Sequence, residues 1–285
     1  MARKNATSDP APESGLELKR GALGAVVDFE LIFEKGMTAL KIRNTHLKKN
    51  GTDDPYTREL LEEAEKFKEM YLLKPVKNIL EEHPAYSWFS RIKGIGNENI
   101  AKVVTFIDIK RAESISALWK YAGYAVVNGV AERPKKGEKL AFNMELKTMC
   151  YRVGAALLKA HALASASKAK VGTKFGYFYE KCLEQEKRKF EAQGKTVLPT
   201  EEWVKTSKKA EHPENLVSEY YVHNRAVRRM IKLFLACLWM YWREAEGLPL
   251  RDPYALDKMD HTTLITPEEM VDREVKKVRN KKKAA

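Results

Sequence analysis

Apolar residues recur every three to four positions over most of this 285-residue chain. That spacing places side chains on one face of an α-helix. No stretch alternates polar and apolar residues for long enough to indicate a half-buried strand, so the pattern predicts an all-α fold. The first helical series comprises Val26, Phe29, Phe33, Met37 and Leu40.

The polar segment KKNGTDDP, residues 48–55, interrupts this periodicity. Asp54 before Pro55 is typical of an N-cap and the first residue of a new helix. Pro75 predicts a kink in this helix or its end. We expect residues 16–83 to form an antiparallel helical hairpin, or a coiled coil, that serves packing or self-association. The apolar face of the second helix comprises Leu60, Ala64, Phe67 and Tyr71.

A glycine-containing turn lies between two further apolar series. Residues 85–92, AYSWFSRI, predict a short helix, KGIG a turn, and residues 97–107, NENIAKVVTFI, a second helix. Glycine permits backbone angles that side chains block, and it lets the main chain come close to a ligand. With Asn97 as the cap, the first N–H groups of the second helix would face outward, and such groups bind anions.

This order matches the helix–hairpin–helix pattern, which grips the nucleic-acid backbone without reading its sequence. Two lysines within a turn of the glycines add positive charge. A tight connection between two helices is the alternative interpretation of the turn. The candidate phosphate-binding residues are Lys93, Gly94, Ile95, Gly96, Asn97 and Lys102.

A long amphipathic helix is predicted between Pro213 and Gly247, with Gly247 and Pro249 as the stop signal. Its apolar side comprises Val227, Met230, Ile231, Phe234, Leu238 and Tyr241. On the opposite side no acidic residue interrupts a basic group, so we predict phosphate contacts there, with a simply solvated face as the alternative. The basic group comprises Arg225, Arg228, Arg229 and Lys232. For His223, beside this group, we predict a packing or hydrogen-bonding role and not a catalytic one.

The net charge of +13 is unevenly distributed. Residues 1–84 carry 14 Lys and Arg against 15 Asp and Glu, whereas residues 85–285 carry 38 against 24. A basic body favours an anionic partner, with duplex DNA first and RNA as the alternative. The segment REVKKVRNKKK, residues 273–283, holds seven of the basic residues, and it either docks on nucleic acid non-specifically or serves solubility.

Other features argue against several classes of protein. Residues 1–15 are polar, so we expect a disordered leader and not a secretory signal. The longest apolar run, Leu233 to Trp242, has ten residues, half of a membrane span, so no membrane partner is expected. The three cysteines, Cys150, Cys182 and Cys237, lie far apart, which favours packed thiols in a reduced cytoplasm, at the nucleoid if DNA is the partner. No cofactor and no metal site is predicted.

Two segments after the turn carry a family resemblance: SISALWKYAGYAVVNG, residues 114–129, and KKGEKLAFNMELKTMCYRVGAALLKA, residues 135–160. Together with the turn they resemble the C-terminal domain of the DEDD-type insertion-sequence transposases, the RNA-bridged recombinases. Gly94-Ile95-Gly96 matches the hairpin of that domain, and residues 118–124, LWKYAGY, match its Leu-x-x-Tyr-Ala-Gly-Leu segment. The resemblance covers residues 84–160 and, more loosely, residues 225–245.

The sequence departs from this family where the chemistry resides. Asn128-Gly129 stands where the family has the Ser-Gly pair whose serine joins DNA ends, and an amide cannot form a phosphoester. The family also has an RNase H-like domain with four acidic metal ligands, whereas the residues before the turn predict helices. The nearest acidic cluster, Asp28, Glu30 and Glu34, does not share one helix face and is interpreted as a solvated surface.

We therefore expect a DNA-binding protein of transposase ancestry that does no chemistry. An active transposase or recombinase and an RNA-binding accessory protein are the alternatives. Ser114 and Ser116 are the nearest other hydroxyls, but their spacing offers no paired base. The expected segments are a leader at 1–15, a helical hairpin at 16–83, a helix–hairpin–helix domain at 84–250 and a basic tail at 251–285. Within the tail, Thr266 to Glu269 is a capping box for a short helix.

Overall fold

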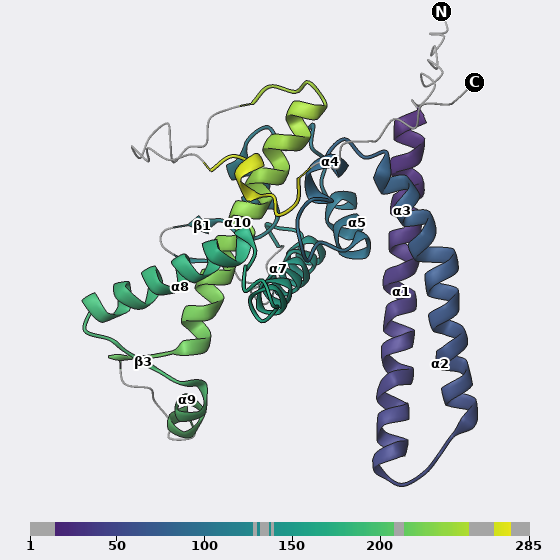
Figure 1. Cartoon of the computed structure of the whole chain (residues 1–285), viewed down its shortest axis with the longest axis horizontal. Coiled ribbons are helices and arrows are strands. Elements are labelled where there is room, and N and C mark those ends of the chain that lie inside the picture. Colours follow the sequence, from purple (N-terminus) through teal and green to yellow (C-terminus); the bar gives the residue numbers. More distant parts are fainter. Residues whose placement is uncertain are drawn as a thin grey trace, which may run out of the picture. The chain divides into compact units, whose positions relative to one another are not determined.

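The computed structural model describes residues 15–127, 130–131, 137, 140–207, 214–250 and 265–274. The chain divides into two compact units, Met1–Glu82 and His83–Ala285 (Figure 1). Asn128-Gly129, nearly all of the expected leader and most of the basic tail lie outside the described residues. The described part of both units is predominantly helical, so the all-α prediction is confirmed.

The first unit is a pair of long helices followed by a shorter continuation. Asp54 caps the second helix as predicted, because its carboxylate accepts the backbone N–H of Thr57 at 3.3 Å and the Thr57 hydroxyl at 2.6 Å. Arg43 of the first helix donates to the same carboxylate at 3.3 Å, which ties the two helices together at their loop. The elements are α1 (Gly15–Lys49), α2 (Pro55–Phe67), η1 (Lys68–Leu73) and α3 (Lys74–Glu81).

Pro75 does not end the helical path. The six residues before α3 form a π-helix, η1, and Pro75 lies in the first turn of α3. Proline has no N–H to donate to the preceding turn and its ring crowds the carbonyl there, so a wider turn just before it accommodates the ring without a break.

The predicted apolar face of α2 is not its buried face. Leu61 and Thr57 are the buried residues of α2, whereas Leu60 is 41%, Phe67 38% and Tyr71 60% exposed. The series lies at the edge of the contact between α1 and α2. The Phe67 ring contacts those of Phe29 and Phe33 on α1, at centroid distances of 6.4 and 5.3 Å, while Phe29 and Phe67 stay partly exposed. A hairpin of two helices covers an apolar stripe from one side only, so part of the stripe stays exposed.

The described residues of the second unit form the other helices and four very short strands. The helices are α4 (Tyr86–Phe89), α5 (Asn97–Thr105), α6 (Ile115–Tyr121), α7 (Met144–Ser165), α8 (Lys174–Ala192), α9 (Thr200–Ser207), α10 (Glu219–Ala245) and the 3₁₀-helix η2 (Glu268–Met270). Strand β1 (Val126–Val127) pairs antiparallel with β2 (Val130–Ala131). Strand β3 (Thr196–Leu198) pairs parallel with β4 (Leu216–Ser218), with Thr196 opposite Leu216.

Helix α10 is the core of this unit and packs against α6, α7 and α8 (Figure 1). Its predicted apolar residues Met230, Phe234 and Leu238 are fully buried, and the left-handed Gly247 follows its end as expected. Beyond the predicted stripe, the helix is buried on almost every side between residues 234 and 239. Among the described residues, no helix combines the length and the apolar character that crossing a bilayer requires.

Gly94 fixes the turn between α4 and α5 against α7. Its φ of +95° lies in the region that favours glycine, and a Cβ there would lie 2.7 Å from the carbonyl oxygen of Ala156 and 2.8 Å from the Cβ of Ala160. Gly96, two residues on, has a φ of −93°, and no atom lies within 4 Å of the position that a Cβ would take there. The two glycines of the turn therefore have different roles.

We expect Gly94→Ala to lower the free energy of unfolding by about 2 to 4 kcal/mol, because it combines backbone strain with a clash against α7. Gly96→Ala is the matched control and should change stability by less than about 0.5 kcal/mol. Urea unfolding followed by circular dichroism measures both. Equal effects of the two substitutions would contradict the separate roles of the glycines.

Candidate nucleic-acid interface

The glycine turn presents the start of α5 to solvent. Gly96, not the predicted Asn97, is the N-cap residue, and it is exposed. Asn97 is the first helical residue, because the chain enters the helix directly after the extended backbone of Gly96. A glycine offers no side-chain oxygen, so no side chain caps this helix. The first-turn N–H groups are therefore not occupied by a cap, which suits an anion site.

Lys102 does not extend this site, contrary to the prediction. It lies in the last turn of α5, is 1% exposed, and forms an ion pair with Glu98 at 3.0 Å. The four-residue spacing places both side chains on the same face of the helix. Lys102 itself is buried, so its charge is compensated within the protein and does not meet solvent at the turn.

An acidic side chain already contacts the turn. The backbone N–H of Lys93 donates to Oδ2 of Asp272 at 2.8 Å, and the backbone N–H of Lys174 donates to Oδ1 at 2.8 Å. Lys174 is the first residue of α8, whose N-cap is Thr173. The same carboxylate thus joins the glycine turn to the start of a second helix. The sequence carries no local signal for this contact, because 179 residues separate Lys93 from Asp272.

The basic residues of α10 are not an isolated cationic face. Glu186 of α8 is 3% exposed, and its carboxylate accepts Arg225 Nε at 2.6 Å and Arg229 Nη1 at 3.3 Å. Arg229 also donates to Gln185 at 2.8 Å. The prediction that no acid interrupts the group holds along α10 but is wrong in three dimensions, because packing brings in an acid from α8. Arg225 and Arg229 still keep 44% and 37% of their side chains exposed.

The other two members of the basic group, Arg228 and Lys232, lie on aromatic rings. Lys232 Nζ is 3.9 Å from the centroid of the Trp119 ring, and the Arg228 guanidinium is 5.5 Å from that of Tyr124. Arg228 also donates to the carbonyl of Ala125 at 2.9 Å. Trp119 and Tyr124 belong to the LWKYAGY segment, so the fold joins this segment to the basic side of α10. Cation–π contacts of this kind hold the charged groups in fixed positions.

Glu186 is the electrostatic centre of this arrangement. Burial alone would raise the pKa of its carboxyl, but the hydrogen bond and charge of Arg225 and the charges of Lys189 and Arg229 outweigh burial and lower it. Conversely, burial lowers the pKa of Lys232, and the nearby charges of Arg228 and Arg229 lower it further. The basic group is therefore partly balanced from inside the protein, and its net charge is smaller than four.

Other residues singled out in the sequence have structural roles. Ser114 caps α6 by accepting the N–H of Ala117 at 3.1 Å. His223 contacts the Tyr179 hydroxyl through Nδ1 at 2.7 Å, and burial lowers its pKa, consistent with the predicted packing role. The prediction of a solvated face is wrong for Glu30, which is 3% exposed and pairs with Lys68 of η1 at 3.1 Å.

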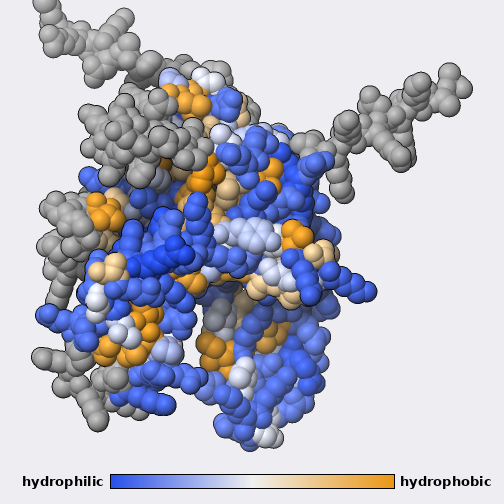
Figure 2. Space-filling model, turned by 60° about the vertical axis from the view of Figure 1, so that its left-hand side comes forward, coloured by the Kyte–Doolittle hydropathy of each residue, from blue (hydrophilic) through white to orange (hydrophobic). Residues whose placement is uncertain are grey.

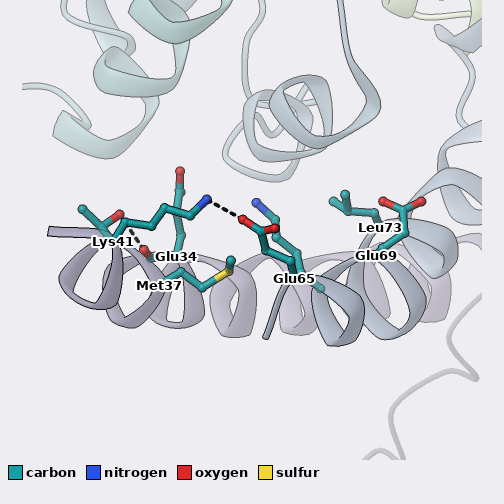
Figure 3. Close-up of a pocket in the computed structure, with 8 residues that line it drawn as sticks. Glu34, Met37, Lys41, Glu65, Glu69 and Leu73 are labelled. Carbon is teal, nitrogen blue, oxygen red and sulfur yellow. Dashed lines mark hydrogen bonds and ion pairs between the residues drawn. The ribbon is translucent and has the colours of Figure 1, made fainter. Parts of the chain in front are cut away.

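The first unit offers a charged groove between α1 and the α2–η1 path, shown in Figure 3. Lys41 crosses it to Glu65, with Nζ 2.9 Å from the carboxylate. Its lining combines three carboxylates with two lysines, so opposite charges face one another there. The lining residues are Glu34, Met37, Thr38, Lys41, Glu65, Lys68, Glu69 and Leu73.

On the face drawn in Figure 2, hydrophilic residues predominate among the described residues, and apolar residues form separate small patches. No family model, no curated protein and no solved structure matches the chain. The evidence for a functional site therefore comes from this molecule's own geometry.

We expect Glu186→Gln to destabilise the protein by about 1 to 2 kcal/mol at pH 7, because Arg225 and Arg229 lose their buried counter-charge. A lowered pKa contributes stability above the ordinary carboxyl value of about 4.3, and that contribution is lost as the pH falls through the folded-state pKa. The difference between wild type and variant should therefore shrink at pH 3. Urea unfolding at both pH values measures it.

Glu184→Gln is the matched control, because Glu184 lies on the same helix and is 64% exposed in its ion pair with Arg188. It should change stability by less than about 0.5 kcal/mol at either pH. A Glu186→Gln effect that stays constant from pH 7 to pH 3 would refute the electrostatic account.

Proposed function

We propose that the chain is a helical DNA-binding protein that grips the phosphate backbone of duplex DNA through the glycine turn. The observation that carries this proposal is the start of α5 at Gly96. There the N-cap is exposed, no side chain caps the helix, and nothing lies within 4 Å of the Gly96 Cβ position. A phosphate oxygen can approach main-chain N–H groups closely only where such space exists.

The basic group of α10 supports the proposal as a second contact region. More than a third of the side-chain surface of Arg225 and Arg229 is exposed to solvent, and Arg228 and Lys232 are held by contacts with aromatic rings. Cations held in place lose less conformational freedom on binding than free side chains do. Glu186 lowers their total charge, so we assign them a supporting contribution to affinity and the turn the central one.

Transposase ancestry belongs to this proposal on the strength of the sequence resemblance. All three parts of the resemblance lie in the second unit: the GIG turn, the LWKYAGY segment and the helix around residues 225–245. The LWKYAGY segment and that helix are also in direct contact. Asn128 in place of the family's serine favours binding without strand joining. An active transposase or recombinase would instead cut DNA in the presence of Mg²⁺, which a nicking assay with supercoiled plasmid detects.

A second part of the proposal is self-association through the first unit. Phe29, Phe33, Phe67 and Tyr71 form a continuous aromatic ladder, with ring centroids 5.0 to 6.4 Å apart. Phe29 is 49% and Tyr71 60% exposed, and Ile32, also on α1, is 68% exposed. Exposed aromatic side chains at helical spacing are typical of helix–helix interfaces. A second copy of the hairpin offers the same surface and would cover the ladder symmetrically.

The DNA-binding proposal predicts opposite effects of Gly96→Asp on stability and on affinity. An aspartate at the N-cap should raise the free energy of unfolding by roughly a few tenths of a kcal/mol, because its carboxylate accepts first-turn N–H groups. The same carboxylate should repel phosphate and weaken duplex binding about fivefold to tenfold. Fluorescence anisotropy with a labelled duplex at 50 and 200 mM salt, and urea unfolding, measure the two effects.

Gly194→Asp is the control with the same substitution and the same change of charge. No atom lies within 4 Å of the position that a Cβ would take on Gly194, but its φ of +69° strains a side chain there, so this variant is the control for affinity and not for stability. Gly194 lies just beyond the far end of α8, roughly 28 Å from the first residue of that helix. Wild-type affinity should fall steeply with salt, and Gly96→Asp should lower the log–log slope by about one unit. Binding that is insensitive to salt, or stronger binding to structured RNA than to duplex DNA, would overturn the DNA proposal.

We expect the wild-type protein to form a dimer at micromolar concentration and Phe29→Asp to shift it to the monomer, because the charge would lie inside the paired ladders. Tyr56→Asp is the control: Tyr56 is 72% exposed at the start of α2 and has no ring contact with the ladder. Sedimentation equilibrium gives the masses. A wild-type protein that stays monomeric, or equal effects of the two substitutions, would contradict self-association through the ladder.

A further inference from the structure

Residues 265–274, which we name the C-terminal strap, lie against the glycine turn and are anchored there at several points. The Trp88 indole donates to the carbonyl of Pro267 at 2.8 Å. Arg91 holds both carboxylate oxygens of Glu268, at 2.6 and 2.8 Å. Met270 is 5% exposed, so the strap also buries an apolar side chain. The strap is therefore packed as an integral part of the second unit.

The strap begins with its own local order. The Glu269 carboxylate accepts the Thr266 backbone N–H at 2.6 Å and the Thr266 hydroxyl at 2.8 Å, which is one half of the predicted capping box. The short helix that follows is η2, and its N-cap residue is Pro267. This turn directs the chain so that the N–H of Asp272 reaches the carbonyl of Arg91 at 3.2 Å. The Asp272 side chain is thereby held next to the glycine turn, and its two oxygens accept the N–H groups of Lys93 and Lys174.

A carboxylate held this way has the chemistry of a phosphate ligand. Two oxygens with one shared negative charge accept two main-chain N–H groups, one from the turn and one from a helix start, as the oxygens of a backbone phosphate do. The strap is acidic in a basic protein, since it contains Glu268, Glu269, Asp272 and Glu274 against the single base Arg273. Its charge disfavours any further anion at the turn.

We propose that the C-terminal strap is an autoinhibitory cover, in which the Asp272 carboxylate occupies the main-chain site that a backbone phosphate of duplex DNA takes when the strap opens. The inference rests on the proposed function. It adds to the exposed start of α5 a second main-chain phosphate contact on the same turn, the Lys93 N–H, and assigns a regulator to that contact. Strap and DNA exclude each other at the Lys93 N–H. The apparent affinity of the protein for DNA is then the intrinsic affinity multiplied by the fraction of molecules with an open strap.

Mutual exclusion also works in the reverse direction. If the closed strap lowers the affinity of the protein for duplex DNA, then bound duplex DNA must shift the strap towards its open form by the same factor. Bound duplex should therefore release residues 265–274 from Trp88 and Arg91. The two effects, tighter binding without the Asp272 carboxylate and strap release on binding, are measured independently of one another.

The experiment compares Asp272→Asn with Glu274→Gln in the full-length chain. Each substitution removes one negative charge from the strap, but only Asp272 bridges the two N–H groups, and the amide of asparagine has one acceptor oxygen in place of two. Fluorescence anisotropy with a labelled duplex at 100 mM salt should give about fivefold tighter binding for Asp272→Asn. Glu274→Gln should change affinity by less than about twofold, the effect of charge alone.

Hydrogen–deuterium exchange of the wild-type protein provides the second measurement. Saturating duplex should speed exchange of the amides of residues 265–274. Equal affinities of the two variants, weaker binding by Asp272→Asn, or slower strap exchange with duplex would overturn the cover while leaving the DNA-binding proposal standing. Absence of duplex binding by wild type and both variants would overturn the DNA-binding proposal and the cover together.

Discussion

The burial of α10 determines the rest of the second unit. A helix that is apolar on nearly all sides between residues 234 and 239 must be covered by several partners, and α6, α7 and α8 supply that cover. Polar groups at its ends are satisfied from the surrounding loops, as when Arg243, 4% exposed, donates to the carbonyls of Ile109 and Ala112 at 2.8 and 3.1 Å. Both candidate contact regions depend on this packing, since the glycine turn rests on α7 and the basic group projects from α10 itself.

The sequence predicted helix starts and ends well where the residues that form them are close together in the chain. The Asp54 cap, the glycine after α10 and the contact of Glu269 with Thr266 each depend on residues within a few positions, and each is present. The strands β1 to β4 escaped prediction because two or three residues are too few to show an alternating pattern. The partial exposure of the apolar face of α2 was not predicted, because periodicity identifies an apolar face without showing how much of it a neighbouring helix covers.

The candidate site was predictable only in part, for an electrostatic reason. The glycine turn and the basic residues of α10 are visible in the sequence, but the acids that compensate them are not adjacent to them. Glu186 lies 39 residues from Arg225, and Asp272 lies 179 residues from Lys93. A count of charges along one helix therefore overstates the field that a ligand meets, since folding pairs part of that charge internally. Lys102 shows the same effect within a single helix.

The π-helix η1 has a consequence for the geometry of the first unit. A wide turn carries an extra residue relative to the regular helix, so it advances the angular phase of every later side chain by about 100°. A seam of side chains that runs along α2 cannot continue in phase along α3, and a heptad register begun at Pro55 is lost after Phe67. Two-helix supercoiling that involves this path is thereby limited to the 13 residues of α2, fewer than two full heptads, whereas the 35 residues of α1 carry no such interruption.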